Sequence, residues 1–476
     1  MPRQTAERPN QDGSRLRHLA LMAEPEREGT ALRENQAERG RLRQPEPTRN
    51  KRQVGRSGQT TRSGQAARLR NAAEPRASAA SLAPPVARYP GRPAGLSRQS
   101  GTQARTAVKR IKPHQMDIFL LVLVVALCAV GLVVLYDVSY YRGLARYSNG
   151  AHFLKQQMYG IAAGFAALIV FSRVDYHFWQ KDKVVAGLVG IAVVALGLVF
   201  LIGKSANGAT RWFVVAGVSV QPSEIAKFAI IVFMAWHLTR NRTRIKQFLP
   251  VFGLPILVVG LMLGLIIAQP NLSTCVHIVG AMLIIFIAGG CNMKYIYGVG
   301  GAAALSGVVL IATAGYRMKR WTSFINPWSD PQGDAYQVIQ SLYALGTGGL
   351  FGVGFGNSRQ KFGYLPFAES DFVFAIIGEE FGLVGAIALI ALFALLAWRG
   401  MRIALASRDR FGSLLATGIT AMVILQVIIN ICVVTASIPA TGLPLPFVSA
   451  GGTSLAILLG EIGILLNISR QVRTKE

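Results

Sequence analysis

The stretch 118–137, IFLLVLVVALCAVGLVVLYD, decides the fold class of this chain. It is uncharged up to its final aspartate, and a helix needs about 20 such residues to cross a hydrocarbon core about 30 Å thick. Nine further apolar runs follow, at 153–171, 184–203, 219–238, 249–268, 275–290, 295–315, 371–397, 412–436 and 453–468. We therefore predict an all-α integral membrane protein with ten transmembrane helices.

The composition agrees with a membrane protein and excludes a water-soluble globular enzyme. Hydrophobic residues make up 51% of the 476 residues and charged residues 15%, whereas charged residues are about 25% of soluble proteins. The four cysteines lie in or beside apolar runs, without metal-ligand or redox spacing. We expect buried thiols and no disulfide bond at Cys128, Cys275, Cys291 and Cys432.

Residues 1–112 differ in character from the rest of the chain. They hold 24 Lys and Arg against 9 Asp and Glu, a net charge of +15, without a sustained apolar face. We predict a disordered basic cytoplasmic tail that contacts anionic lipid rather than nucleic acid. Residues 113–476 hold 26 basic and 14 acidic residues, a net charge of +12, and form the membrane domain. No cleavable signal peptide is expected, because over a hundred polar residues precede the first apolar run.

The charged connections predict the orientation of the membrane domain. An even number of spans places both termini on one side, and Lys and Arg favour the cytoplasmic side. Basic residues gather in alternate connections, around 173–183, 240–246 and 399–410. We therefore expect both termini in the cytoplasm. The long connection 316–370 then lies outside the cell, and connections of this length are usually functional.

The segment Gln221-Pro222-Ser223-Glu224-Ile225-Ala226-Lys227 places two charges in an apolar run. Proline suits the first turn of a helix, and residues three apart share one helix face. One interpretation of Glu224 and Lys227 is a buried ion pair that ties helices together. The other is that Lys227, with Arg211 just before it, presents positive charge to a phosphate or diphosphate.

The outer connection contains the polar, turn-rich segment Phe324-Ile325-Asn326-Pro327-Trp328-Ser329-Asp330-Pro331-Gln332-Gly333-Asp334-Ala335-Tyr336-Gln337. Asp-Pro and Gln-Gly pairs are turn signals. On composition alone, a turn-capping role for Asp330 is favoured over a catalytic one.

In combination and order, several motifs make residues 115–470 resemble the SEDS (shape, elongation, division and sporulation) glycosyltransferases, most closely the FtsW and SpoVE branches. They are Arg211-Trp212-Phe213; Gln221-Pro222-Ser223-Glu224 with Lys227; Asn326-Pro327-Trp328-Ser329-Asp330-Pro331; Tyr336-Gln337 with Gln340-Ser341; Gly348-Gly349-Leu350-Phe351-Gly352; Gln360-Lys361 with Leu365-Pro366; Asp371-Phe372 with Glu379-Glu380; and Thr441-Gly442 with Pro444-Leu445-Pro446-Phe447 and Gly451-Gly452.

The resemblance implies a peptidoglycan polymerase that joins lipid II units on the outer face of the membrane. Asp330 matches the presumed catalytic aspartate, and a carboxylate can act as general base toward an attacking hydroxyl. The leaving lipid diphosphate calls for cations: Lys227, Arg211 or a divalent metal ion, Mg²⁺ or Mn²⁺. One-step displacement predicts inversion at the anomeric carbon. The resemblance also implicates Glu224, Gln337, Gln340 and Ser341 in substrate binding, with Asp334, Lys361, Asp371, Glu379 and Glu380 as further candidates.

The same resemblance implies the setting of the reaction. The expected partners are lipid II, undecaprenyl-linked glycan, a class B penicillin-binding protein and other division membrane proteins. The expected location is the bacterial cell membrane at the division septum, and the Pro327-Trp328 pair favours division or sporulation over elongation. Two alternatives stay open: a lipid II flippase or transporter, since intramembrane charges are common in transporters, and a non-catalytic scaffold of division.

Three positions depart from the family pattern. Phe367 stands where a Leu-Pro-Glu motif is expected, with Glu369 two residues later. Asn271 replaces the aspartate of a Pro-Asp-Leu-Gly motif, and Ala450 replaces a tyrosine before the Gly-Gly pair. These departures leave Asp330, Glu224 and Lys227 in place and allow a divergent paralogue.

Overall fold

The computed structural model describes residues 116–472, except 207–208, 216–217 and 334. The chain divides into a unit at Met1–Gln103 and a unit at Ala104–Glu476. The predicted tail 1–112 lies outside the described residues, and everything below concerns the second unit.

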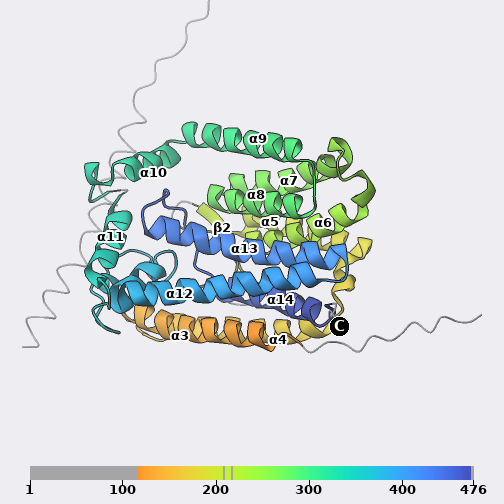
Figure 1. Ribbon diagram of the computed structural model, residues 1–476. Helices are drawn as coiled ribbons and strands as arrows, with labels where there is room; N and C mark the ends of the chain where they lie inside the picture. The colour runs from red at the N-terminus through yellow and green to blue at the C-terminus, as the bar shows by residue number, and fades with distance from the viewer. Residues whose placement is uncertain (1–115, 207–208, 216–217, 334, 473–476) are drawn as a thin grey trace, which may run out of the picture. The chain divides into compact units, whose positions relative to one another are not determined.

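A bundle of long helices forms this unit (Figure 1). In chain order they are α3 (Ile118–Tyr147), α4 (His152–Arg173), α5 (Asp182–Ile202), α6 (Pro222–Arg240), α7 (Leu254–Ala268), α8 (Leu272–Ala288), α9 (Met293–Ala312), α12 (Val373–Ala406), α13 (Arg410–Val434) and α14 (Gly452–Ser469). Each lies over one of the predicted apolar runs, so the helical fold class is confirmed. Among the described residues, eight helices are long and apolar enough to span a membrane. The other two are the 17-residue α8 and α6, which carries Glu224 and Lys227. The count of ten spans therefore stays a prediction.

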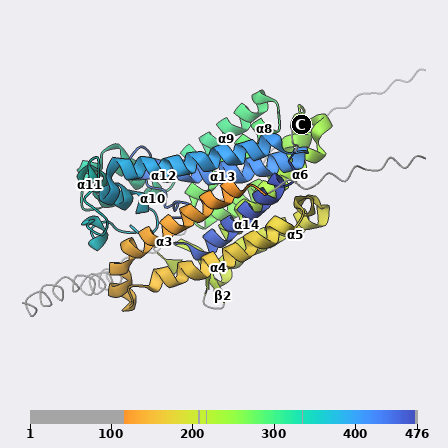
Figure 2. The same cartoon turned by 60° about the horizontal axis from the view of Figure 1, so that its bottom comes forward.

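The centre of the bundle lies around α13 and α14. In the apolar 18-residue segment of each of these helices, 67% is buried inside the protein. Figure 2 shows α14 beside α4. A Cβ on Gly160 of α4 would collide with the backbone of Gly452. Only small residues allow backbones to approach this closely. By contrast, α9 lies at the edge of the bundle in Figure 1, and only 6% of its apolar 18-residue segment is buried.

A small antiparallel sheet between α5 and α6 was not predicted. Its strands are β1 (Lys204–Ala206), β2 (Ala209–Val215) and β3 (Val218–Val220), in the order β1-β2-β3, with Phe213 opposite Val220. The predicted span from 219 was therefore wrong at its start. Val218–Val220 is a strand, and α6 begins only at Pro222, because proline lacks the N–H that a helix interior requires.

The long connection after α9 is structured. It contains α10 (Gly315–Ile325), the short 3-10 helix η5 (Pro327–Ser329), α11 (Tyr336–Gly348) and a second 3-10 turn η6 (Gln360–Phe362). Figure 1 places α10 and α11 at one end of the bundle.

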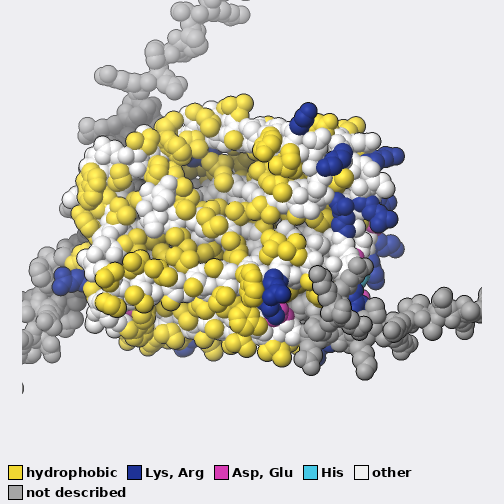
Figure 3. Space-filling view, in the orientation of Figure 1, with side chains coloured by type: hydrophobic (Ala, Val, Ile, Leu, Met, Phe, Trp, Pro, Cys, Tyr) yellow, Lys and Arg dark blue, Asp and Glu magenta, His cyan; other side chains and the backbone are white. Residues whose placement is uncertain are grey.

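The described region starts and finishes at the other end of the bundle. The Asp117 N–H donates to Ser469 Oγ at 3.2 Å, and Arg399 Nε lies 2.6 Å from Asp117 Oδ2. Figure 3 shows most Lys and Arg side chains gathered at this end, next to a broad band of hydrophobic side chains. This charge asymmetry has the form that positive-inside topology requires.

Helix α12 is interrupted near its start at Gly382, where φ is +65°. Leu383 N–H and Val384 N–H turn away from their own helix and donate to the carbonyls of Gly349 and Leu350, at 2.9 and 3.1 Å. In exchange, the carbonyls of Glu379 and Glu380 accept from Val353 and Gly354, at 2.9 and 3.0 Å. Residues 349–364, here called the strap, thus satisfy the backbone groups that the break releases, as a lipid environment demands.

The break predicts a strong effect of Gly382→Ala. An L-residue at this positive φ costs about 1–3 kcal/mol, and its Cβ would collide with Gly352 N and Leu350 O. We expect a lower melting temperature in detergent, measured by size-exclusion chromatography after heating. Gly187→Ala is the matched control, because a Cβ there meets nothing within 4 Å. Equal melting temperatures for the two variants would contradict this account of the break.

Candidate functional site

Asp330 lies on an exposed loop between α10 and α11. It directly follows η5, and its carbonyl accepts from Gly333 N–H at 3.3 Å. Trp328 beside it packs on Tyr343 of α11, with ring centroids 6.1 Å apart. The loop therefore presents the Asp330 carboxylate at the end of the bundle opposite the described termini, while Asp334 lies outside the described residues.

Two arginines from distant segments act on the carboxylate of Asp371, just before α12. Arg211 on β2 donates from Nε to the carbonyl of Gln269 at 3.4 Å and also bonds the carbonyl of Pro270. Arg320 on α10 donates to the carbonyl of Ala440 at 3.3 Å. Both guanidinium groups interact electrostatically with Asp371. Arg211 and Arg320 thus act on Asp371 electrostatically, while these hydrogen bonds go to backbone carbonyls.

Burial raises the pKa of Asp371 to about 6, with a further rise from Glu369, while the two arginines oppose the shift. Burial likewise lowers the pKa of Arg211, as does neighbouring Arg320. Guanidinium groups bind phosphate oxygens with good geometry, so Arg211 and Arg320 are candidates to contact a diphosphate. Sequence reasoning missed Arg320, although the run Tyr316-Arg317-Met318-Lys319-Arg320-Trp321 in the outer connection carried the signal.

Glu224 and Lys227 form the ion pair of the first interpretation. Lys227 Nζ lies 2.8 Å from Glu224 Oε2, and it also donates to Gln426 Oε1 of α13 at 2.9 Å. Ser454 Oγ of α14 donates to Glu224 at 3.0 Å. The pair thus joins α6, α13 and α14. Arg211 instead bonds carbonyls before α8, so the structure does not join it to Lys227, and diphosphate binding by Lys227 stays a prediction.

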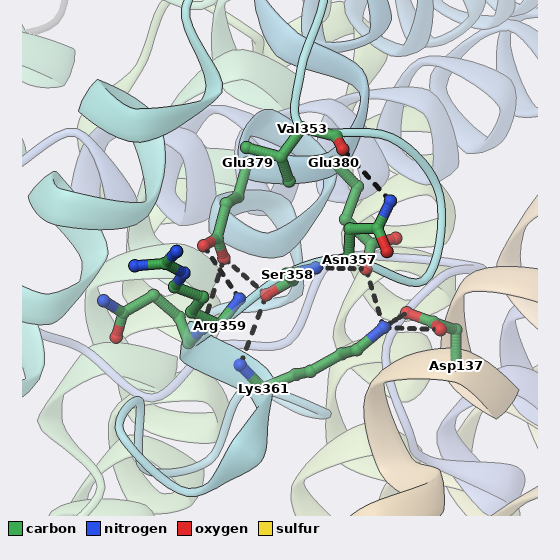
Figure 4. Close-up of polar contacts among 9 residues, drawn as sticks. Asp137, Val353, Asn357, Ser358, Arg359, Lys361, Glu379 and Glu380 are labelled. Carbon is green, nitrogen blue, oxygen red and sulfur yellow. Dashed lines mark hydrogen bonds and ion pairs between the residues drawn. The ribbon is translucent and has the colours of Figure 1, made fainter.

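Lys361, Glu379 and Glu380 meet in a buried network that holds the strap (Figure 4). Lys361 Nζ lies 2.6 Å from Asp137 Oδ1 on α3 and 2.8 Å from Glu380 Oε1 on α12. Ser358 N–H donates to Glu380 at 3.2 Å, and the Ser358 hydroxyl bonds Glu379. These side chains thus serve to fix the strap between α3 and α12.

The predicted glutamine and serine contacts lie on α11. Ser341 is buried, and its hydroxyl donates to the carbonyl of Val434 on α13 at 2.7 Å, which is a packing role. Gln337 and Gln340 are half-buried on the same helix.

Each of the three departures makes local contacts in the structure. Arg142 pairs with Glu369 at 2.5 Å and covers the ring of Phe367, its guanidinium carbon 4.9 Å from the centroid. Asn271 caps α8: its Oδ1 accepts from the Thr274 N–H at 3.4 Å and from the Thr274 hydroxyl at 2.9 Å, so a carboxylate is not needed for capping. Ala450 donates its N–H to the carbonyl of Glu369 at 2.9 Å.

The described residues hold no group of three or more His, Cys, Asp or Glu side chains that could bind a metal ion. Mg²⁺ commonly takes only one or two carboxylates and completes its shell with water and substrate phosphates. The expected Mg²⁺ or Mn²⁺ therefore stays a prediction.

Known proteins resemble this chain in sequence and in fold. A family model described as "Cell cycle protein", covering FtsW, RodA and SpoVE, matches residues 118–474. Stage V sporulation protein E of Bacillus subtilis (strain 168) is 40% identical over 364 residues, covering 76% of this chain and 99% of the relative. The probable peptidoglycan glycosyltransferase FtsW of Geobacter sp. (strain M18) is 38% identical over 358 residues, covering 75% and 97%.

Two solved structures share the fold. One is titled "Structural coordination of polymerization and crosslinking by a peptidoglycan synthase complex"; it has a TM-score of 0.62 and 28% identity, covering 75% of this chain and 98% of its own. The other is the rod shape determining protein RodA of Thermus thermophilus, with a TM-score of 0.56, 25% identity, and coverage of 76% and 98%.

The buried network predicts that Lys361→Met is strongly destabilising. It leaves Asp137 and Glu380 buried without their cation, and breaking a buried ion pair costs about 3–5 kcal/mol. Thermal unfolding in detergent should show the loss. Lys294→Met, at an exposed lysine, is the control, and a Lys361→Met variant as stable as this control would refute the role of the network.

The raised pKa of Asp371 predicts a pH-dependent contribution to stability. The pKa of Asp371 is about 4 in the unfolded chain and about 6 in the folded protein. Between these two pH values, the folded state binds more protons at this group than the unfolded state does. Stability from this group is therefore present below that window and lost as pH rises through it. The melting temperature of Asp371→Asn minus that of wild type should therefore increase as pH rises from 4 to 6. Above pH 6 this difference should stay constant. A difference that does not vary with pH would exclude this behaviour.

Proposed function

The chain belongs to the FtsW, RodA and SpoVE family of cell cycle proteins, and on this basis we propose that it is a peptidoglycan glycosyltransferase that polymerises lipid II. The observation that carries the proposal is the extent of the likeness, since the matches span 97–99% of the relatives named above. Their names describe a peptidoglycan glycosyltransferase, a sporulation protein and a synthase complex. These names favour the polymerase over a flippase or a scaffold.

Asp330 is the proposed general base. During chain growth, a sugar hydroxyl attacks the anomeric carbon of the lipid-linked glycan and loses its proton as the new bond forms. An exposed carboxylate on the outer loop can accept that proton, which general bases achieve with gains of about 10²–10⁴-fold. Attack from the face opposite the diphosphate inverts the anomeric carbon, so an α-linked donor gives a β-linked glycan.

Arg211 and Arg320 are the proposed partners of the leaving lipid diphosphate. Both act on Asp371, and the guanidinium group forms bidentate hydrogen bonds with phosphate oxygens. A diphosphate that binds between the two guanidinium groups would offset their positive charge. Stabilising negative charge as it develops on the leaving group is a principal source of rate acceleration. Mg²⁺ or Mn²⁺ bound to the diphosphate would add to this charge stabilisation, and Lys227 is retained as a further candidate contact.

The proposed orientation places the basic end of the bundle and both termini in the cytoplasm, following the positive-inside rule. Asp330 then faces the outside, where the glycan is built. We propose a class B penicillin-binding protein as partner, since one similar structure belongs to a complex that couples polymerisation with crosslinking. The proposed site of action is the septum, in division or sporulation, among other division membrane proteins.

Loss of the base should abolish polymerisation. Purified Asp330→Ala, supplied with fluorescent lipid II, the partner transpeptidase and Mg²⁺ or Mn²⁺, should form glycan at least about 100-fold more slowly than wild type. Asp182→Asn, at an exposed aspartate paired with Arg240, is the control and should retain activity. Gel separation of the product measures both. Wild-type rates from folded Asp330→Ala would refute the assignment of the base, and lipid II transport that survives the substitution would favour the flippase.

A further inference from the structure

A partly enclosed polar cavity lies between α6, α13, α14 and the loop that joins α13 to α14. Its volume is about 40 Å³. Its polar side chains are Glu224 and Lys227 of α6, Gln426 of α13, Ser454 and Glu461 of α14, and Ser449 of the loop between α13 and α14. Ala450 also lines it, and its small side chain leaves the space open.

The charges around this cavity do not balance. Lys227 is engaged by Glu224 at 2.8 Å and by Gln426 at 2.9 Å, so the ammonium group and the first carboxylate cancel each other. Glu461 is only 6% exposed, and no hydrogen bond or ion pair joins its carboxylate to any other residue that the structure describes. When Glu461 is ionised, its charge is therefore the one that no ion pair cancels in this cavity.

An isolated carboxylate at membrane depth costs several kcal/mol and is seldom left without a counter-charge. Protonation is one way to remove this charge. A bound cation cancels the charge and satisfies the oxygen lone pairs together. The cavity has room for it, because one water needs about 10–15 Å³ by this measure, so an ion fits with one or two waters.

We propose that this cavity binds a monovalent alkali cation through the carboxylate of Glu461. A single uncompensated negative charge matches a single positive charge, and the hard oxygen atoms of Glu461, Glu224 and Ser454 suit an alkali ion. A divalent ion would face excess positive charge beside Lys227, and the net negative charge repels an anion. The proposal is independent of the glycosyltransferase reaction, since it concerns Glu461, which that reaction does not use.

Thermal unfolding of the purified full-length protein in detergent tests the proposal. Melting temperatures are compared in NaCl, KCl and choline chloride at equal ionic strength and pH. An ion that binds only the folded state stabilises it in proportion to RT ln(1 + [L]/Kd). We expect a saturable rise of a few degrees in Na⁺ or K⁺ over choline.

Two variants assign the effect to the cavity. Glu461→Gln removes the uncompensated charge, so it should melt at the same temperature in all three salts. In choline it should be at least as stable as wild type, because no buried charge is left without a partner. Asp182→Asn, at an exposed aspartate, should keep the full response of wild type to alkali ions.

Direct binding of ²²Na⁺ to detergent-purified protein gives a second measurement. Wild type should bind about one ion per chain, in competition with unlabelled alkali ions, and Glu461→Gln should bind none. Equal melting temperatures of wild type in all three salts, together with no ²²Na⁺ binding, would overturn the proposal. An unchanged alkali response in Glu461→Gln would also overturn it.

Discussion

Every backbone amide and carbonyl at membrane depth must find its partner within the protein, because hydrocarbon offers none. Uninterrupted helices meet this demand along most of the bundle. Where α12 breaks at Gly382, the strap meets it instead, by exchanging backbone hydrogen bonds at Val353 and Gly354 for those at Leu383 and Val384. The irregular segment is thereby a fixed part of the structure.

The strap in turn depends on a buried charge network. Lys361 sits between the carboxylates of Asp137 and Glu380, which come from α3 and α12. Buried charges persist only when they are paired with good geometry. The network therefore joins α3 to α12, which begins beside Asp371, and the backbone exchange at Gly382 is held from two sides.

The end of the bundle opposite the described termini collects groups suited to phosphate chemistry. Arg211 arrives on a strand, Arg320 on a short helix of the outer connection, and Asp371 at the start of α12. The loop with Asp330 follows α10 and η5, so Asp330 and Arg320 lie in the same connection between α9 and α11. Deeper in the bundle, Glu224 and Lys227 neutralise each other. The bundle thus separates the arginines near Asp371 from the Glu224–Lys227 ion pair, which lies between α6, α13 and α14.

Much of this architecture was determined by the sequence alone, because length and apolarity suffice to predict helices in lipid. The runs such as 118–137, the helix start at Pro222 and the shared face of Glu224 and Lys227 are local properties. The residue pattern around Asp330 likewise carried the family. Only the tertiary structure decided the rest, because it depends on contacts between segments far apart in the chain. Lys361 pairs with Asp137, Arg320 acts electrostatically on Asp371, and Glu461 lines a cavity, because packing brings together segments that are far apart in the sequence.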